Sequence, residues 1–283
     1  TTRLRPASPE VGTTAWQARV WIDANRPVVH VEMEAGQPFT TSVAHETWRT
    51  QKRALKGGEI RGSTGLSKLP AAERPSVDAD TAPDGQKDQI VFFHRNTASV
   101  WGAHMRAQLM GDFIKPDADP LLNCTFGCLV RGGGLVSDGK GTLTAKAPAT
   151  RFSIAITALT AQTPTGDEWI QKVTALADAA GRVPLDQART EHAKWWRDFW
   201  NRSWIVVSGA KEGNDKDKED AQTVTRGYTL QRWINACAGR GAYPIKFNGS
   251  LFNVDCVRTI TSYCGPCKFD ADFREWGGAY WGQ

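Results

Sequence analysis

Amide and carboxylate side chains alternate with large aromatic side chains between residue 247 and the end of the sequence. Aromatic rings can stack on the CH faces of a polyhydroxylated ring, while amides and carboxylates can make paired hydrogen bonds to its hydroxyl groups. Glycines between these side chains allow the backbone to approach a ligand closely. The pattern therefore predicts a sugar-binding site. The predicted hydroxyl ligands and stacking residues are Asn248, Asn253, Asp255, Trp276 and Trp281.

The element expected to position this stretch is a helix over residues 224–238, which precedes it. Gly239 and Gly241 follow that helix, and glycine commonly ends a helix because it adopts positive φ at no cost. The same aromatic and amide residues could instead fix the turns of loops. For each of them separately, the sequence leaves both interpretations open.

Three motifs in this region carry a family resemblance, namely Tyr228-Thr-Leu-Gln-Arg-Trp, Pro244-Ile-Lys-Phe-Asn-Gly-Ser-Leu-Phe and Trp276-Gly-Gly-Ala-Tyr-Trp. They resemble the start of the catalytic domain in the family 95 glycoside hydrolases, which are inverting α-L-fucosidases and α-L-galactosidases. The similarity is to an uncharacterised bacterial branch rather than to the fucosidases themselves. It covers residues 226–283 specifically and the rest of the chain loosely. The resemblance implies an antiparallel β-(super)sandwich, a helical linker and an (α/α)6 toroid.

The resemblance also implies how catalytic roles are distributed. An inverting glycosidase needs a general acid and a general base with carboxyl groups about 6.5–9.5 Å apart. In the family, asparagines beginning near the position of Gln283 help to hold the attacking water, so Gln283 joins the predicted substrate contacts. The acid and base are expected beyond Gln283, and neither Asp255 nor Glu275 is assigned a catalytic role. The catalytic residues are therefore unknown.

Hydrophobic periodicity changes along the chain and predicts its division into domains. Alternating patterns such as residues 16–23, 29–33 and 151–159 predict strands, so residues 1–163 are interpreted as the sandwich domain. Residues 164–210 are interpreted as the helical linker and residues 211–283 as the start of the toroid domain.

Within the linker, helices are predicted over residues 167–180 and 185–201, followed by a short strand at 203–208. Residues 61–88, which are rich in turn formers, predict a long exposed excursion. The mixed-charge run at residues 211–220 predicts a solvated loop.

The chain is expected to be an internal fragment. The residues from Ala221 onward are too few for the helices of an (α/α)6 toroid at about 11 residues each. We therefore expect the toroid to be truncated and the sandwich to lack its first part. The fragment alone is expected to be inactive.

The histidines of the predicted strands and of the linker give one further candidate. His94 follows an apolar strand and could reach the sugar site on a loop, or could belong to a hydrogen-bonded strand end. His30 and His45 are interpreted as packed or surface residues, and His192 as part of a buried helix face.

The six cysteines do not establish a metal site or a redox site. Cys264-Gly-Pro-Cys267 has the spacing of a redox pair but lacks the strand and helix that normally flank that motif. The sequence leaves three alternatives open for these cysteines: a zinc site that also includes Cys256, a local disulfide, or free thiols. No metal and no cofactor are predicted.

Composition argues against several classes of partner. The formal net charge of +5 is modest and no run of basic residues forms a stripe, so nucleic acid is not expected. No apolar run reaches the about 18 residues that suggest a membrane span. The compartment stays open, with the periplasm or the exterior favoured over the cytoplasm.

The function predicted for the intact protein is hydrolysis of a glycosidic bond with inversion, at a nonreducing-end sugar such as α-L-fucose or α-L-galactose. The partner is then an oligosaccharide or polysaccharide. One alternative is a noncatalytic carbohydrate-binding or scaffold protein. The other is a lyase or a phosphorylase built on the same architecture.

Overall fold

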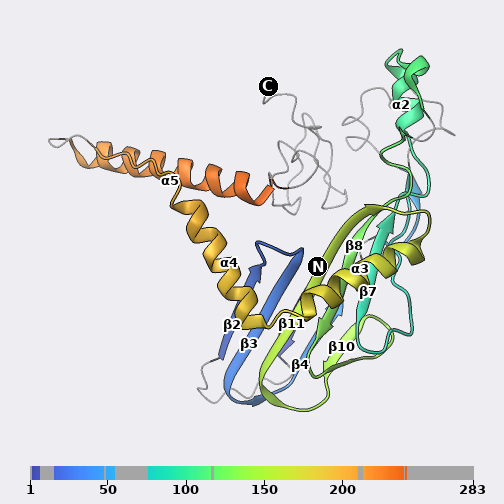
Figure 1. Cartoon of the computed structure of the whole chain (residues 1–283), viewed down its shortest axis with the longest axis horizontal. Helices are drawn as coiled ribbons and strands as arrows, with labels where there is room; N and C mark the ends of the chain where they lie inside the picture. Colours follow the sequence, from blue (N-terminus) through green and yellow to red (C-terminus); the bar gives the residue numbers. More distant parts are fainter. Residues whose placement is uncertain are drawn as a thin grey trace. The chain divides into compact units, whose positions relative to one another are not determined.

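The computed structural model describes residues 2–6, 16–47, 49–54, 76–115, 118–209, 213–238 and 240 (Figure 1). The chain divides into two compact units. The first unit comprises Thr1–Ala54 and Pro75–Trp196, and the second comprises Leu55–Arg74 and Arg197–Gln283.

The first unit contains a five-stranded sheet in which every pair of neighbours is antiparallel. In spatial order its strands are β2 (Trp16–Ile22), β3 (Val28–Phe39), β11 (Ala149–Gln162), β8 (Cys124–Gly132) and β7 (Ile90–Arg95). The long strand β11 occupies the centre, where Ile154 pairs with both Val31 and Gly132.

A four-stranded antiparallel sheet lies against one face of the first sheet. Its strands, in spatial order, are β1 (Thr2–Pro6), β4 (Thr41–His45), β10 (Thr142–Ala145) and β9 (Leu135–Ser137). A separate short pair joins β5 (Arg53–Ala54) to β6 (Ser76–Val77).

The two sheets share one hydrophobic core. Alternate side chains of β3 and β11, including Val31 and Ile154, meet Val43 of β4 and Leu143 of β10, and all four are at most 5% exposed. This is the burial that period-2 patterning produces when one face of each strand points inward. The antiparallel β-sandwich predicted from the sequence is thereby confirmed for the described residues.

Helix α3 (Gly166–Gly181) covers the outer face of the five-stranded sheet (Figure 1). The Thr165 hydroxyl caps the helix by accepting a hydrogen bond from the Glu168 amide at 3.1 Å. Trp169 and Val173, one turn apart, are fully buried against Phe93 and other residues of β7 and β8. The predicted helix over residues 167–180 is confirmed.

Helix α4 (Leu185–Trp200) also agrees with its prediction, but the next segment does not. Residues 203–208, predicted as a strand, form no strand. Side chains of the helix that follows form hydrogen bonds to backbone groups that a neighbouring strand would otherwise bind. The Val207 amide donates to the Thr225 hydroxyl at 2.9 Å, and Arg232 donates to the Ser203 carbonyl.

Helix α5 (Asp215–Ala238) begins earlier than predicted and includes half of the charge run that was predicted as a loop. The loop prediction for residues 215–220 is therefore wrong. Asn214 and Asp217 explain the early start because each side chain accepts a hydrogen bond at 3.1 Å from the other's backbone amide. Acidic residues in the first turn also suit the positive end of the helix dipole.

Two further helical segments, α2 (Trp101–Ala107) and η3 (Gly111–Phe113), were not predicted from the sequence. The predicted excursion over residues 61–88 is partly wrong, because its described residues include β6 and a bridge from Thr81 to Phe93.

Candidate functional site

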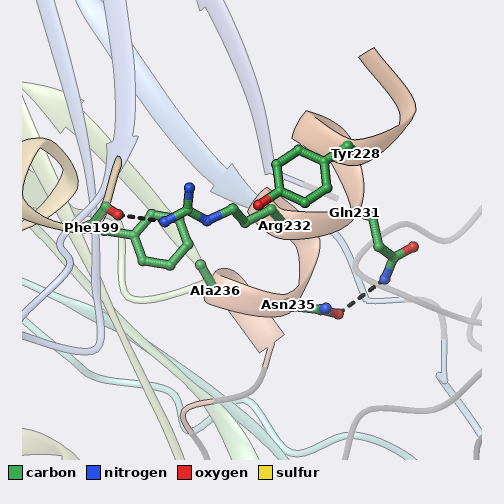
Figure 2. Close-up of a pocket in the computed structure, with 6 residues that line it drawn as sticks. All are labelled: Phe199, Tyr228, Gln231, Arg232, Asn235 and Ala236. Atoms are coloured by element: carbon green, nitrogen blue, oxygen red, sulfur yellow. Dashed lines mark hydrogen bonds between the residues drawn. The ribbon is translucent and has the colours of Figure 1, made fainter. Parts of the chain in front are cut away.

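A pocket of about 400 Å³ lies on one side of α5 in the second unit. Its lining residues come from the end of α4 and from successive turns of α5: Phe199, Tyr228, Gln231, Arg232, Asn235 and Ala236. The α5 members are spaced three or four residues apart, so helical geometry places them along one face. Figure 2 shows their side chains along the helix, with the Phe199 ring opposite.

Arg232 connects the two walls of this pocket. Its guanidinium donates to the Phe199 carbonyl at 2.6 Å and to the Ser203 carbonyl. The guanidinium carbon lies 4.5 Å from the centre of the Phe199 ring and 5.2 Å from that of Trp200. Two carbonyls and two aromatic rings therefore fix the orientation of this cation.

The other polar groups of the pocket are neutral. Gln231 donates to the side-chain carbonyl of Asn235 at 3.0 Å, which leaves amide donors and acceptors of both residues at the pocket surface (Figure 2). Tyr228 supplies a phenol and an aromatic face. None of the described lining residues carries a carboxyl group. The arrangement can bind hydroxyl groups and stack against a ring, but it contains no acid–base pair.

His94, the candidate from the sandwich, is a member of β7 rather than of the loop after it. It is 8% exposed, and its Nδ1 lies 3.0 Å from Oδ1 of Asp80. Asp80 also accepts a hydrogen bond from Nε of Arg49 at 2.7 Å, and the Phe126 ring lies 5.3 Å from the imidazole. The carboxylate favours the tautomer that carries its proton on Nδ1.

A second polar cluster joins the β2–β3 hairpin to the first turns of α4. Asp23 is 4% exposed and accepts a hydrogen bond from Arg26 at 2.9 Å, and Arg26 in turn donates to Glu191 at 2.5 Å. The Ala24 amide donates to Nδ1 of His192 at 3.2 Å. These contacts fasten α4 to the sheet edge.

His30 completes this cluster from β3, where its ring stacks on Trp21 at 4.2 Å. Burial lowers the pKa of both His30 and His192, against the opposing effect of the Asp23 carboxylate. Among the described residues, no group of three or more His, Cys, Asp or Glu side chains is placed to hold a metal ion.

The main site predicted from the sequence cannot be located in the structure. Its members all lie outside the described residues: Asn248, Asn253, Asp255, Trp276, Trp281 and Gln283. The same is true of Cys256, Cys264 and Cys267. The three described cysteines, Cys124, Cys128 and Cys237, are free thiols.

The pocket on α5 was not predicted as a site, although Tyr228, Gln231 and Arg232 fall within a motif that supported the family resemblance. The signal that could have found it is a polar and aromatic stripe at positions 228, 231, 232 and 235. An ordinary core helix would carry aliphatic residues at that spacing.

No described helix combines the length and the apolar character that crossing a bilayer requires.

Comparison with known proteins gives few relatives. No curated protein matches the chain. A solved structure described as "Putative kojibiose phosphorylase from human microbiome" matches with a TM-score of 0.37 and 9% sequence identity. That match covers 83% of this chain and 26% of the other, so the chain spans about a quarter of that protein's length. The resemblance to family 95 and to the fucosidases stays a prediction.

A family model gives the clearest assignment. The model described as "Domain of unknown function (DUF5703)" matches residues 8–205, which include the strands β2 to β11 and the helices α3 and α4. Because this match spans more than half of the sequence, the chain belongs to the DUF5703 family.

Proposed function

We propose that the protein is carbohydrate-active and that the pocket on α5 binds a sugar unit of an oligosaccharide or polysaccharide. The observation that carries this proposal is the lining itself, in which Tyr228 and Phe199 present aromatic surface beside the amides of Gln231 and Asn235. The pocket volume of about 400 Å³ falls within the roughly 300–1,000 Å³ of small-molecule sites.

The chemistry of sugars explains why this combination is suitable. A pyranose presents CH groups on its faces and hydroxyl groups around its rim. Aromatic faces bury the former, and a side-chain amide can donate to one hydroxyl while accepting from its neighbour. Gln231 and Asn235 bond to each other at 3.0 Å, which holds both amides in place before a ligand arrives.

The proposed reaction of the intact protein is hydrolysis of a glycosidic bond with inversion, at the nonreducing end of the substrate. Hydrolysis with inversion requires two carboxyl groups about 6.5–9.5 Å apart, and the described lining residues supply none. We therefore assign the pocket to binding rather than to bond cleavage. Asn248, Asn253, Asp255, Trp276, Trp281 and Gln283 remain the proposed contacts of the reacting sugar, with His94 as a proposed contribution from the sandwich.

A carbohydrate-binding protein without catalysis is the second candidate. It is favoured by the same absence of carboxyl groups from the pocket lining, because binding alone requires none. The family 95 specificity for α-L-fucose or α-L-galactose is a further, finer proposal that rests on sequence resemblance.

The test compares two glutamines on the same helix. Gln231→Ala removes an amide from the pocket, whereas Gln222→Ala removes an exposed amide that does not line it. Binding of an oligosaccharide panel, measured by calorimetry, should weaken about fivefold or more in Gln231→Ala, since one lost neutral hydrogen bond costs about 1 kcal/mol. Gln222→Ala should bind as the wild type does.

Incubation of the intact protein with aryl glycosides, followed by NMR of the released anomer, distinguishes the two candidates. Release of the inverted anomer supports the hydrolase, and binding without release supports the binding protein. Equal affinity in both glutamine variants would remove the pocket from the sugar site.

A further inference from the structure

No described carboxylate pairs with Arg232, in contrast to several other arginines of the described chain. Arg26, Arg49, Arg131, Arg151 and Arg189 each form an ion pair with an aspartate or glutamate. The described partners of Arg232 are two backbone carbonyls and two aromatic rings. These partners orient the guanidinium, and none of the described residues supplies a counterion for its positive charge.

Arg95 is the useful comparison, since it too contacts only neutral oxygen atoms. Arg95 makes six hydrogen bonds through its two terminal nitrogens, so the N–H donors of both nitrogens are engaged by other residues of the fold. Arg232 makes two and therefore keeps unused N–H donors. It also lines the pocket. Arg232 is consequently available to a ligand in a way that Arg95 is not.

The sequence of α5 around the pocket contains no acidic residue. Residues 221–240 contain three arginines, at positions 226, 232 and 240, and no aspartate or glutamate. The last acidic residue of the helix, Asp220, precedes Arg232 by twelve positions. At 1.5 Å per residue this is about 18 Å along the axis, which exceeds the Debye length of about 8 Å at physiological salt.

We propose that the pocket on α5 binds an acidic saccharide and that Arg232 pairs with the sugar's anionic oxygen group, a carboxylate or a phosphate ester. This inference rests on the proposed function and narrows it to a ligand class. The guanidinium fork suits both groups, because two of its N–H bonds can meet two anionic oxygens. Gln231, Asn235 and Tyr228 lie within four residues of Arg232 on the same face, so they can contact the hydroxyl groups of the same ring.

The test compares acidic and neutral sugars of the same shape. Methyl β-D-glucuronide and methyl β-D-glucoside differ only at C6, and glucose 1-phosphate with inorganic phosphate tests the phosphate ester. Affinity for the full 283-residue chain is measured by calorimetry or NMR titration. The glucuronide or the sugar phosphate should bind at least about tenfold more tightly than the neutral glucoside, as expected for a charge-assisted hydrogen-bonded pair. That advantage should shrink as salt rises from about 50 to 300 mM, since salt screens a partly exposed charge.

Variants locate the effect. Arg232→Gln should reduce the affinity for the acidic sugar to that for the neutral sugar. Arg226→Gln, which removes the same charge from an exposed position on the same helix, should change affinity less than about twofold. Arg232 also holds the Phe199 and Ser203 carbonyls, so Arg232→Gln could disturb the pocket itself. The salt dependence of the wild type is the readout that does not depend on that variant.

Each result has one meaning. Preference for the glucuronide identifies a carboxylate site, and preference for glucose 1-phosphate over inorganic phosphate identifies a phosphate-ester site. Inorganic phosphate binding as tightly as the sugar phosphate would overturn the saccharide assignment. Equal, salt-independent affinity for acidic and neutral sugars would overturn the anionic assignment but leave the proposed function standing. Absence of any saccharide binding would overturn both.

Discussion

Replacing Arg95 by methionine should destabilise the sandwich more than any comparable change of a surface arginine. Arg95 ends β7, and its guanidinium bonds to two other segments, residues 123–125 at the start of β8 and residues 163–164 after β11. Four of its six hydrogen bonds are 2.8 Å long, to the Thr125 hydroxyl, the Asn123 side chain, and the carbonyls of Thr163 and Pro164. Methionine keeps much of the stem's volume but offers no donor. The acceptors would therefore lose their partners without a large cavity being formed.

The magnitude follows from which acceptors water can reach. Thr125 is fully buried and Thr163 is 1% exposed, whereas the bond to the Pro164 carbonyl lies at the surface and water can replace it. Leaving a buried acceptor unsatisfied costs about 1–3 kcal/mol, so the Thr125 hydroxyl and the Thr163 carbonyl together suggest a loss of about 2–4 kcal/mol. At about 2–4 °C per kcal/mol for a domain of this size, Tm should fall by about 10 °C.

The matched control is Arg151→Met on β11. Arg151 pairs with Glu34 at 2.6 Å, but its side chain is 76% exposed, and exposed ion pairs contribute about 0–1 kcal/mol. Urea unfolding followed by far-UV circular dichroism gives the free energy of unfolding for both variants. Equal losses in the two variants would refute the reasoning, because they would show that the buried acceptors find water or rearrange at little cost.

Two further predictions concern titrating groups. Burial lowers the pKa of His30 and His192, with Asp23 and Glu32 opposing and Arg26 reinforcing the shift at His30. The unfolded chain therefore takes up protons first as the pH falls below about 6.5, so these histidines favour the folded state above that pH and the advantage is lost toward their lower folded pKa. Urea unfolding should give a lower free energy of unfolding at pH 5.5 than at pH 7.5. This difference should be smaller in the double variant His30→Gln, His192→Gln. An unchanged difference would exclude these two residues as its source. Burial also raises the pKa of the Cys128 thiol to about 11, while Cys237 is exposed. Iodoacetamide at pH 8 should therefore label Cys237 before Cys128 in the native protein. In denaturant both should be labelled at similar rates, as measured by mass spectrometry. Faster native labelling of Cys128 would contradict its lower exposure and its raised pKa.

Strong local patterns made much of the fold predictable. The alternation in residues 151–159 identified β11, and Gly181 marked the end of α3. The segment at 203–208 misled the prediction because its run of apolar β-formers is typical of a strand, while strand formation depends on a partner. Here the Thr225 hydroxyl and Arg232 occupy its backbone groups instead.

Long-range contacts set the limit for the rest. The start of α5 depends on a reciprocal pair of hydrogen bonds between Asn214 and Asp217. The sequence did not indicate this pair because a mixed-charge run is more typical of a loop. Gly127 is an ordinary strand glycine by sequence, yet an added Cβ there would lie 2.1 Å from the Phe92 carbonyl of β7. The pocket on α5 also requires Phe199. A charged segment separates Phe199 from Tyr228 in the sequence, and no local pattern indicates that the two residues meet.

The position of β11 has a consequence for synthesis of the protein. This strand lies at the centre of its sheet, between β3 and β8, yet it is the last of the sandwich strands to leave the ribosome. More than a hundred residues separate Val31 from its partner Ile154, which takes roughly 10 s to translate at about 10 residues per second. During that interval β3 exposes an unpaired hydrogen-bonding edge, the kind of surface that promotes aggregation, and β8 exposes another in the last part of it. Nascent chains that stall before β11 should therefore depend on chaperones far more than the finished sandwich does.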